Sequence, residues 1–358
     1  MKIFAVNSSA RGAAQSKTKL LLDHLAAGMK EAGADVEVVD LKDKKVNTCI
    51  GCFTCWTKTP GTCVHKDDMS SELFPKFMGA DLVVLATPLF HYTMNAELKK
   101  FIERTLPIIQ PFFAVSGAET YHPLRHPHPG VVMLSVAGFP EISVFDQLSS
   151  WANFIYGRPG GLVAEIYRPF AEALLLPAFR KKAQDVFDAV RQAGKEIVQS
   201  WKVSPETMSR ITQDLTEDSR AFLLGVGNCM WKTCISEGLT PKEMAEAGKI
   251  PRADSVESFM SMMELGFNPD KAGKLRAVMQ FTFTGDGGQS CYFEIADGAI
   301  KAKKGTAEKP DLTISTPFEL WMDIMTGKQD GQQMFMQGKY TFKGEMDLLM
   351  RMKDLFTA

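Results

Sequence analysis

The sequence lacks the features that mark membrane, secreted and nucleic-acid-binding proteins. No apolar run approaches the length that a membrane-spanning helix requires. The opening segment MKIFAVN is strand-like and lacks the length of a secretory hydrophobic region. The formal net charge is −1, so no excess of basic residues recruits nucleic acid. We therefore expect a cytoplasmic protein with no nucleic-acid partner and no integral membrane segment.

Four of the seven cysteines are concentrated in one short stretch, Cys49-x2-Cys52-x2-Cys55-x7-Cys63. In a reducing compartment, clustered cysteines bind metal or do redox work more often than they form disulfides. Three closely spaced thiols plus a fourth is iron–sulfur spacing, although zinc also accepts four thiolates. A redox dithiol pair or metal-free thiols also fit. The spacing alone leaves all of these open.

Short apolar runs alternate with segments of helical period over the first two hundred residues, which predicts an α/β fold with a five-stranded parallel sheet. Strands are expected at residues 2–6, 36–39, 82–86, 131–136 and 162–166, and helices at 17–32, 96–106, 145–156 and 178–201. Such continuously apolar strands are typical of a sheet covered on both faces. Ligands of these sheets bind outside the carboxyl ends of the strands.

Three loops with unusual residues follow predicted strands. Residues 8–18 combine small residues and hydroxyls with Arg11 and Lys17, which suits a phosphate at a helix N-terminus, although neither common glycine pattern is present. The same residues also fit an ordinary helix start capped by Ser16. Residues 87–95 and 135–141 offer aromatic and apolar groups to a flat ring, although ordinary turns between strand and helix explain them too. No acid–base role is assigned to His91.

Together, a phosphate-type loop and two ring-contacting loops make up a site for flavin mononucleotide (FMN). At these residues the chain resembles the flavodoxin-like NAD(P)H-dependent FMN reductases. Within them it is similar to the iron–sulfur flavoproteins, in the Cys49–Cys63 motif, Asp67–Met69, Ala86–Phe90 and Leu98–Arg104. The resemblance covers about the first two hundred residues.

This resemblance implies NAD(P)H as cosubstrate, a homodimer or tetramer, and a 4Fe–4S cluster as one occupant of Cys49, Cys52, Cys55 and Cys63. The residues expected to bind FMN are Ser9, Arg11, Ser16, Lys17, Thr18, Thr87, Pro88, Leu89, Phe90, His91, Tyr92, Thr93, Ala137, Gly138 and Phe139. The phosphate is expected on the first five of them and the isoalloxazine on the others. The flavodoxin-like domain is expected to span residues 1–203.

The remaining chain divides into a helical connector, residues 204–254, and an antiparallel α+β domain, residues 255–358. Cys229 and Cys234 are interpreted as core thiols, because no histidine accompanies them. In the last domain, Gly285–Gly288 is expected to be a hairpin turn. Its many methionines suit either a plain core or a pocket for varied apolar ligands.

Four motifs of this last part resemble the SCP-2 sterol-carrier domain: Lys309–Ile314, Met325–Lys328, Phe335–Lys339 and Phe342–Met346. That resemblance implies a hydrophobic tunnel for a fatty acyl, sterol-like or quinone-like molecule. The leading hypothesis is therefore an FMN reductase-like oxidoreductase that passes electrons from NAD(P)H to an acceptor. If the acceptor is apolar, the SCP-2-like domain would present it. The alternatives are an iron–sulfur flavoprotein that takes electrons from ferredoxin, and a lipid carrier whose N-terminal domain is a scaffold.

Overall fold

The computed structural model describes residues 1–12, 15–158, 160–285 and 288–356. Its contacts divide the chain into two compact units. Unit 1 comprises Met1–Leu175 and Phe179–Leu215, and unit 2 comprises Leu176–Ala178 and the described residues from Thr216 onward. The predicted boundaries after residues 203 and 254 stay predictions. Within the described ranges, no helix has both the length and the apolar character that crossing a membrane takes.

Unit 1 is built on a five-stranded sheet with the strand order β2-β1-β3-β6-β7, in which every neighbouring pair is parallel. The strands are β1 Lys2–Asn7, β2 Asp35–Asp40, β3 Leu82–Pro88, β6 Gly130–Val136 and β7 Leu162–Arg168. This order is the flavodoxin-like one, and it confirms the predicted α/β sheet. The order reverses between β1 and β3, where such folds bind their ligand.

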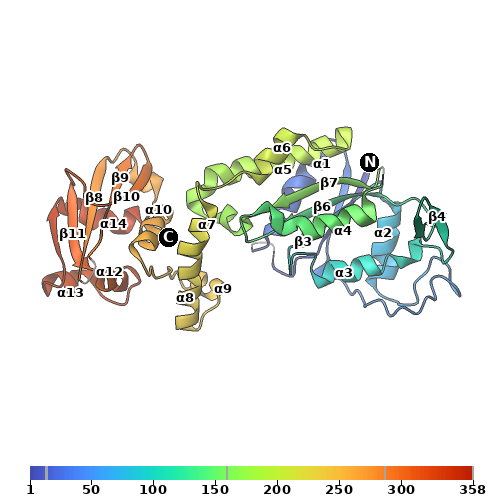
Figure 1. Ribbon diagram of the computed structural model, residues 1–358, viewed down its shortest axis with the longest axis horizontal. Coiled ribbons are helices and arrows are strands. Elements are labelled where there is room, and N and C mark those ends of the chain that lie inside the picture. Colours follow the sequence, from blue (N-terminus) through green and yellow to red (C-terminus); the bar gives the residue numbers. More distant parts are fainter. Residues whose placement is uncertain (13–14, 159, 286–287, 357–358) are drawn as a thin grey trace. The chain divides into compact units, whose positions relative to one another are not determined.

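Helices cover both faces of this sheet, as Figure 1 shows. One face carries α1 Lys17–Glu31 and α5 Arg180–Ser200, and the other carries α2 Phe74–Gly79, α3 Ala96–Glu103 and α4 Asp146–Tyr156. Helices α1 and α5 approach closely because glycines lie at their contact. A Cβ atom on Gly28 would lie 1.8 Å from the carbonyl oxygen of Arg191, and one on Gly194 would lie 2.2 Å from that of Leu25.

Smaller elements complete unit 1. They are the hairpin β4 Ala114–Ser116 and β5 Glu119–Tyr121, helix α6 Pro205–Thr212, the π-helical turn Met69–Leu73, and the 3₁₀ turns Leu41–Asp43, Leu106–Ile108, Ile142–Phe145 and Ala171–Leu175. The 3₁₀ turn Pro177–Phe179 is divided between the units, since Pro177 and Ala178 belong to unit 2. Helix α6 lies in the predicted connector, yet it packs against α5 within unit 1. Arg168 Nη1 fixes the end of α6 by donating to the carbonyl oxygens of Ile211 (2.8 Å) and Gln213 (2.7 Å).

Unit 2 contains a second five-stranded sheet, with the order β10-β9-β8-β11-β12. The strands are β8 Ala277–Thr284, β9 Ser290–Ala296, β10 Ala299–Lys304, β11 Leu312–Pro317 and β12 Thr341–Gly344. The predicted antiparallel arrangement is wrong for one pair, because β8 and β11 run parallel. After β10 the chain returns to the end of the sheet at which β8 begins, and β11 starts there. The pattern of apolar residues in the strands does not reveal such a return. The expected hairpin turn includes residues 286 and 287, which lie outside the described residues.

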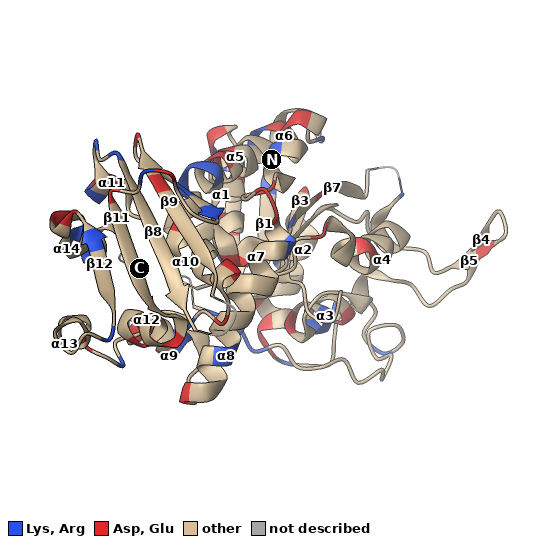
Figure 2. Ribbon diagram, turned by 60° about the vertical axis from the view of Figure 1, so that its left-hand side comes forward, with Lys and Arg blue, Asp and Glu red and all other residues tan. Residues whose placement is uncertain are grey.

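Unit 2 also contains helices and an aromatic core. The helices are α7 Ser219–Phe222, α8 Asn228–Glu237, α9 Pro241–Glu246, α10 Val256–Gly266, α11 Pro269–Ala272, α12 Phe318–Met325, α13 Gly331–Met336 and α14 Met346–Leu355, with a π-helical turn at Leu223–Gly227. Of these helices, α10, α12 and α14 contact the sheet. Phe259 of α10 is fully buried, and its ring centroid lies 5.1 to 5.8 Å from those of Phe281, Phe283 and Phe293. Figure 2 shows charges of both signs interspersed over the elements, in keeping with the net charge of −1.

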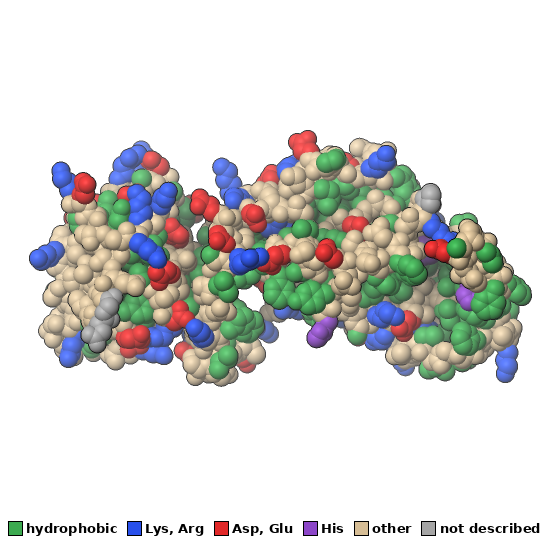
Figure 3. Space-filling model, in the orientation of Figure 1, with side chains coloured by type: hydrophobic (Ala, Val, Ile, Leu, Met, Phe, Trp, Pro, Cys, Tyr) green, Lys and Arg blue, Asp and Glu red, His purple; other side chains and the backbone are tan. Residues whose placement is uncertain are grey.

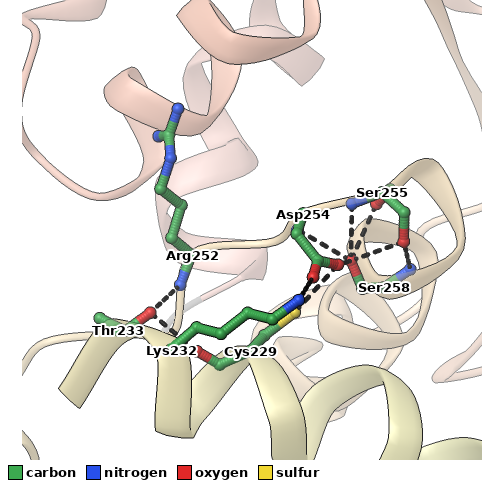
Figure 4. Close-up of polar contacts among 7 residues, drawn as sticks. All are labelled: Cys229, Lys232, Thr233, Arg252, Asp254, Ser255 and Ser258. Atoms are coloured by element: carbon green, nitrogen blue, oxygen red, sulfur yellow. Dashed lines mark hydrogen bonds and ion pairs between the residues drawn. The ribbon is translucent and has the colours of Figure 1, made fainter. Parts of the chain in front are cut away.

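Cys229 and Cys234 of α8 are buried, which confirms their interpretation as core thiols. Figure 4 shows Cys229 within a polar cluster that joins α8 to the start of α10. Its Sγ lies 3.4 Å from Asp254 Oδ1, and Asp254 also pairs with Lys232. Burial raises the pKa of the Cys229 thiol, so this sulfur stays protonated and serves the packing of unit 2.

Candidate functional site

The loops that follow β1, β3 and β6 meet at the carboxyl edge of the first sheet. Ser8 Oγ donates to the carbonyl oxygen of Ala86 (3.0 Å), and Asn95 Nδ2 donates to that of Ser8 (2.7 Å). Ser135 Oγ donates to the carbonyl oxygen of Thr87 (2.9 Å). The three predicted loops therefore lie together, held by buried polar side chains, as the parallel topology requires.

The first loop leads directly into helix α1. Ser9, Ser16 and Thr18 are buried, and Ser16 Oγ caps the helix by accepting from the amide of Lys19 (3.1 Å). The first amides of a helix have no partner within it, so the start of α1 offers N–H groups to an anion. The helix-cap interpretation of Ser16 is confirmed, and the cap occupies one of these N–H groups, the amide of Lys19.

The two cations of this loop share one carboxylate that the sequence analysis missed. Glu172 Oε1 lies 2.8 Å from Arg11 Nη1, and Glu172 Oε2 lies 2.6 Å from Lys17 Nζ. Burial alone would raise the pKa of Glu172, but the hydrogen bonds from Lys17 and Arg11 outweigh it and lower that pKa. Glu172 is therefore ionised at neutral pH and lies beside the predicted phosphate position.

The second loop contains a strained turn. Phe90 and Thr93 exchange backbone hydrogen bonds of 2.9 and 3.0 Å, while His91 and Tyr92 between them have φ values of +47° and +64°. Left-handed backbone at two consecutive non-glycine residues costs free energy and is typical of functional sites. The turn leaves Phe90, His91 and Tyr92 exposed, while Pro88, Leu89 and Thr93 are half-buried and Thr87 is buried.

The third loop places a second aromatic ring beside the turn. Phe139 and Tyr92 are each more than half exposed, and their rings are nearly parallel, at 6° between planes and 6.4 Å between centroids. Ala137 is buried, and a Cβ atom on Gly138 would meet no atom within 4 Å. Two parallel exposed rings next to open space fit a flat heteroaromatic group such as the isoalloxazine of FMN.

All four predicted metal-binding cysteines line one cavity, together with His65, Glu103 and Arg104. Cys55 is buried, Cys49 and Cys63 are half-buried, and Cys52 is exposed. Burial raises the pKa of Cys55, and the neighbouring cysteines raise it further, whereas hydrogen bonds with Thr54 lower the pKa of Cys52. Within the described ranges, no group of three or more His, Cys, Asp or Glu side chains is placed to hold a metal ion.

The donors around this cavity nevertheless suit a sulfur-rich group. Arg104 is buried beside Cys63, and its Nε has no oxygen or nitrogen partner among the described residues. Nε2 of His65 is also buried and has no hydrogen-bond partner among the described residues. Hydrogen bonds to cluster sulfurs are among the contacts that tune iron–sulfur centres. The side chains present thus fit a cluster in their chemistry.

An exposed apolar surface adjoins the cysteine loop. Phe112, Phe113 and Val115 are each at least two-thirds exposed, and Figure 3 shows hydrophobic side chains gathered over the β4–β5 hairpin. The ring of His122 lies 4.8 Å from that of Phe113 and 4.9 Å from that of Trp56, centroid to centroid. The hairpin and the cysteine loop are therefore packed together through aromatic contacts.

Two family models match separate parts of the chain. Residues 1–137 match NADPH-dependent FMN reductase, and residues 263–357 match the SCP-2 sterol transfer family. The chain joins an FMN-reductase domain to an SCP-2 domain. Both resemblances seen in the sequence are confirmed, and so is the assignment of the first domain to an oxidoreductase family.

The relatives of the FMN-reductase domain include proteins that are named as flavoproteins or as FMN-dependent enzymes. An iron-sulfur flavoprotein of Archaeoglobus fulgidus is 40% identical over 87 residues, which are 24% of this chain and 38% of that protein. An iron-sulfur flavoprotein of Methanocaldococcus jannaschii is 32% identical over 109 residues, 30% of this chain and 52% of that protein. An FMN-dependent NADH-azoreductase from Bacillus anthracis, solved in complex with FMN, has a TM-score of 0.42 and 13% identity over 55% of this chain and 99% of that chain. This chain spans about half or less of the length of the two flavoproteins.

The match to the FMN-reductase family ends at Ala137, so it includes the first two loops and the cysteines but neither Phe139 nor Glu172.

The sequence analysis missed Glu172 and the cavity residue Arg104. A local signal existed for Glu172, because it follows the fifth strand of the sheet and so lies at the carboxyl edge. For Arg104 the available signal was its place in the quoted Leu98–Arg104 motif.

Proposed function

We propose that the FMN-reductase domain is an FMN-dependent NAD(P)H oxidoreductase that passes electrons to an acceptor. The observation that carries the proposal is the convergence of the three loops, with hydroxyls and cations on one side and parallel exposed rings on the other. Ser9, Arg11, Ser16, Lys17 and Thr18 would bind the phosphate, and residues 87–93 and 137–139 would orient the ring. When bound, FMN accepts a hydride from NAD(P)H and delivers the electrons onward.

An absorption experiment tests this proposal. Purified protein incubated with FMN should retain a bound flavin whose visible bands bleach under anaerobic conditions when NADPH or NADH is added. Arg11→Met should weaken FMN binding about tenfold, because it removes a charge-assisted hydrogen bond to the phosphate. Lys19→Met is the matched control, since Lys19 pairs with Asp23 on the same helix. Absence of FMN binding at micromolar concentration would refute the proposal.

A second candidate function is electron transfer through an iron–sulfur cluster at Cys49, Cys52, Cys55 and Cys63. It is favoured by the single cavity that these cysteines share with the buried cation Arg104. Anaerobic iron and sulfide analysis should find about four of each per chain in the wild type and little in Cys52→Ser. Cys234→Ala removes a buried cysteine of unit 2 and should keep the iron. Equal iron in all three proteins, or none in the wild type, would rule the cluster out.

We further propose that the SCP-2 domain binds an apolar molecule and presents it to the flavin when that molecule is the electron acceptor. A tethered binding domain raises the local concentration of its ligand. The match to the SCP-2 family and the methionines of α12 to α14 support an apolar ligand. Native mass spectrometry after incubation with palmitate or a short-chain quinone should show a bound molecule. Bound lipid without any flavin would favour a lipid carrier instead.

A further inference from the structure

The carboxylate of Glu172 lies between the two cations that the proposed phosphate site offers. Its oxygens contact Arg11 Nη1 at 2.8 Å and Lys17 Nζ at 2.6 Å, so each cation is already paired. The Lys17 side chain is only 13% exposed, which leaves its ammonium group few other partners. A phosphate that approaches these cations therefore meets an anion that already binds them.

The backbone holds Glu172 in this position from the ring-binding side of the site. The amide of Phe170 donates to the carbonyl oxygen of Phe139 (2.7 Å), and the amide of Ala171 donates to that of Ala137 (2.8 Å). The segment that carries Glu172 is thus anchored to the third loop. The contact with Arg11 and Lys17 therefore links the proposed ring site to the proposed phosphate site.

We propose that Glu172 competes with the phosphate of FMN for Arg11 and Lys17 and thereby limits the affinity for the phosphorylated flavin. A carboxylate and a phosphate offer the same kind of oxygen acceptors to a guanidinium or ammonium group. Binding of the phosphate then requires the carboxylate to leave, or to remain as a nearby like charge, and either reduces the affinity. This inference rests on the FMN site proposed above.

Titration of flavin fluorescence with FMN and with riboflavin tests the competition, because riboflavin has the same ring system without the phosphate. Glu172→Gln keeps the size of the side chain and removes its charge. We expect the dissociation constant for FMN to fall about tenfold in this variant, while that for riboflavin stays the same. The difference between wild type and variant should shrink as salt is added, because exposed charges are screened.

The matched control is Asp23→Asn. It changes the net charge by the same amount and frees Lys19, which lies on helix α1 together with Lys17. It should leave both dissociation constants unchanged. An unchanged or weaker FMN affinity in Glu172→Gln would overturn the inference while leaving the FMN site intact, and so would an equal gain for riboflavin. A lower dissociation constant for FMN in Glu172→Gln, with that for riboflavin unchanged, would support the competition. If neither protein binds FMN, both the inference and the proposed function are wrong.

Discussion

Arg104 and Asp67 form a buried, two-pronged ion pair. Nη1 of Arg104 lies 2.7 Å from Oδ2 of Asp67, Nη2 lies 3.0 Å from Oδ1, and the two side chains are 1% and 0% exposed. Nη1 also donates to the carbonyl oxygen of Asn47 (2.8 Å). Since Asn47 and Asp67 flank the four cysteines, this one guanidinium fixes both ends of the cysteine loop to the end of α3.

Removing the charge of Asp67 should therefore destabilise unit 1 strongly. In Asp67→Asn, the buried guanidinium of Arg104 loses its counter-charge, and breaking a buried pair in this way costs about 3 kcal/mol or more. The free energy of unfolding from urea denaturation measures the effect. Asp68→Asn is the control, because its carboxylate accepts an exposed hydrogen bond from the amide of Lys45 and has no buried ion-pair partner among the described residues. A loss no larger than that of the control would contradict the role of the pair.

The same pair predicts how stability depends on pH. Burial would raise the pKa of Asp67, but hydrogen bonds from Arg104 and from the amides of Asn47 and Ser70 hold it well below its usual range. The stabilisation is therefore complete above the unfolded-state pKa of about 3.9 and is lost as the pH falls further. The gap in unfolding free energy between wild type and Asp67→Asn should be about 1 kcal/mol smaller at pH 3 than at pH 7. A constant gap would speak against this linkage.

The strands of the first sheet could be predicted because burial on both faces leaves a direct trace in the sequence. Residues 82–86 and 131–136 are almost wholly apolar, and β3 and β6 contain them. The β4–β5 hairpin leaves no such trace. Val115 of β4 is 72% exposed, so no buried face imposes an alternating pattern.

Pairings between distant residues were beyond the reach of local patterns. Arg11 and Glu172 are 161 positions apart, and only the order of strands in the sheet brings them together. The parallel pairing of β8 with β11 depends likewise on the path of the chain between them. The residue types at the candidate site could thus be predicted loop by loop, but the pairing of Arg11 and Lys17 with Glu172 could not.

The crossing of α1 and α5 depends on a missing side chain at Gly28. Because a Cβ atom there would lie 1.8 Å from the carbonyl oxygen of Arg191, Gly28→Ala must push the two helices apart. We expect a loss of about 3 kcal/mol in the free energy of unfolding, the upper end for overpacking. Gly79→Ala is the control, since no atom lies within 4 Å of its added Cβ. Equal stability of the two variants in urea would show that the helices adjust without cost.

The described core cluster of unit 2 shares no residue with the described core cluster of unit 1, so damage to the unit 2 cluster should leave unit 1 folded. Phe259 is fully buried at the centre of the aromatic cluster of unit 2, and Phe259→Ala should destabilise that unit by about 3 kcal/mol or more. Calorimetry should show one unfolding transition lowered and the other unchanged, with FMN binding retained. Met336→Ala, at a side chain that is 78% exposed, should change neither transition. Loss of flavin binding in Phe259→Ala would mean that the flavin site needs an intact SCP-2 domain, and the separate-core argument would then fail.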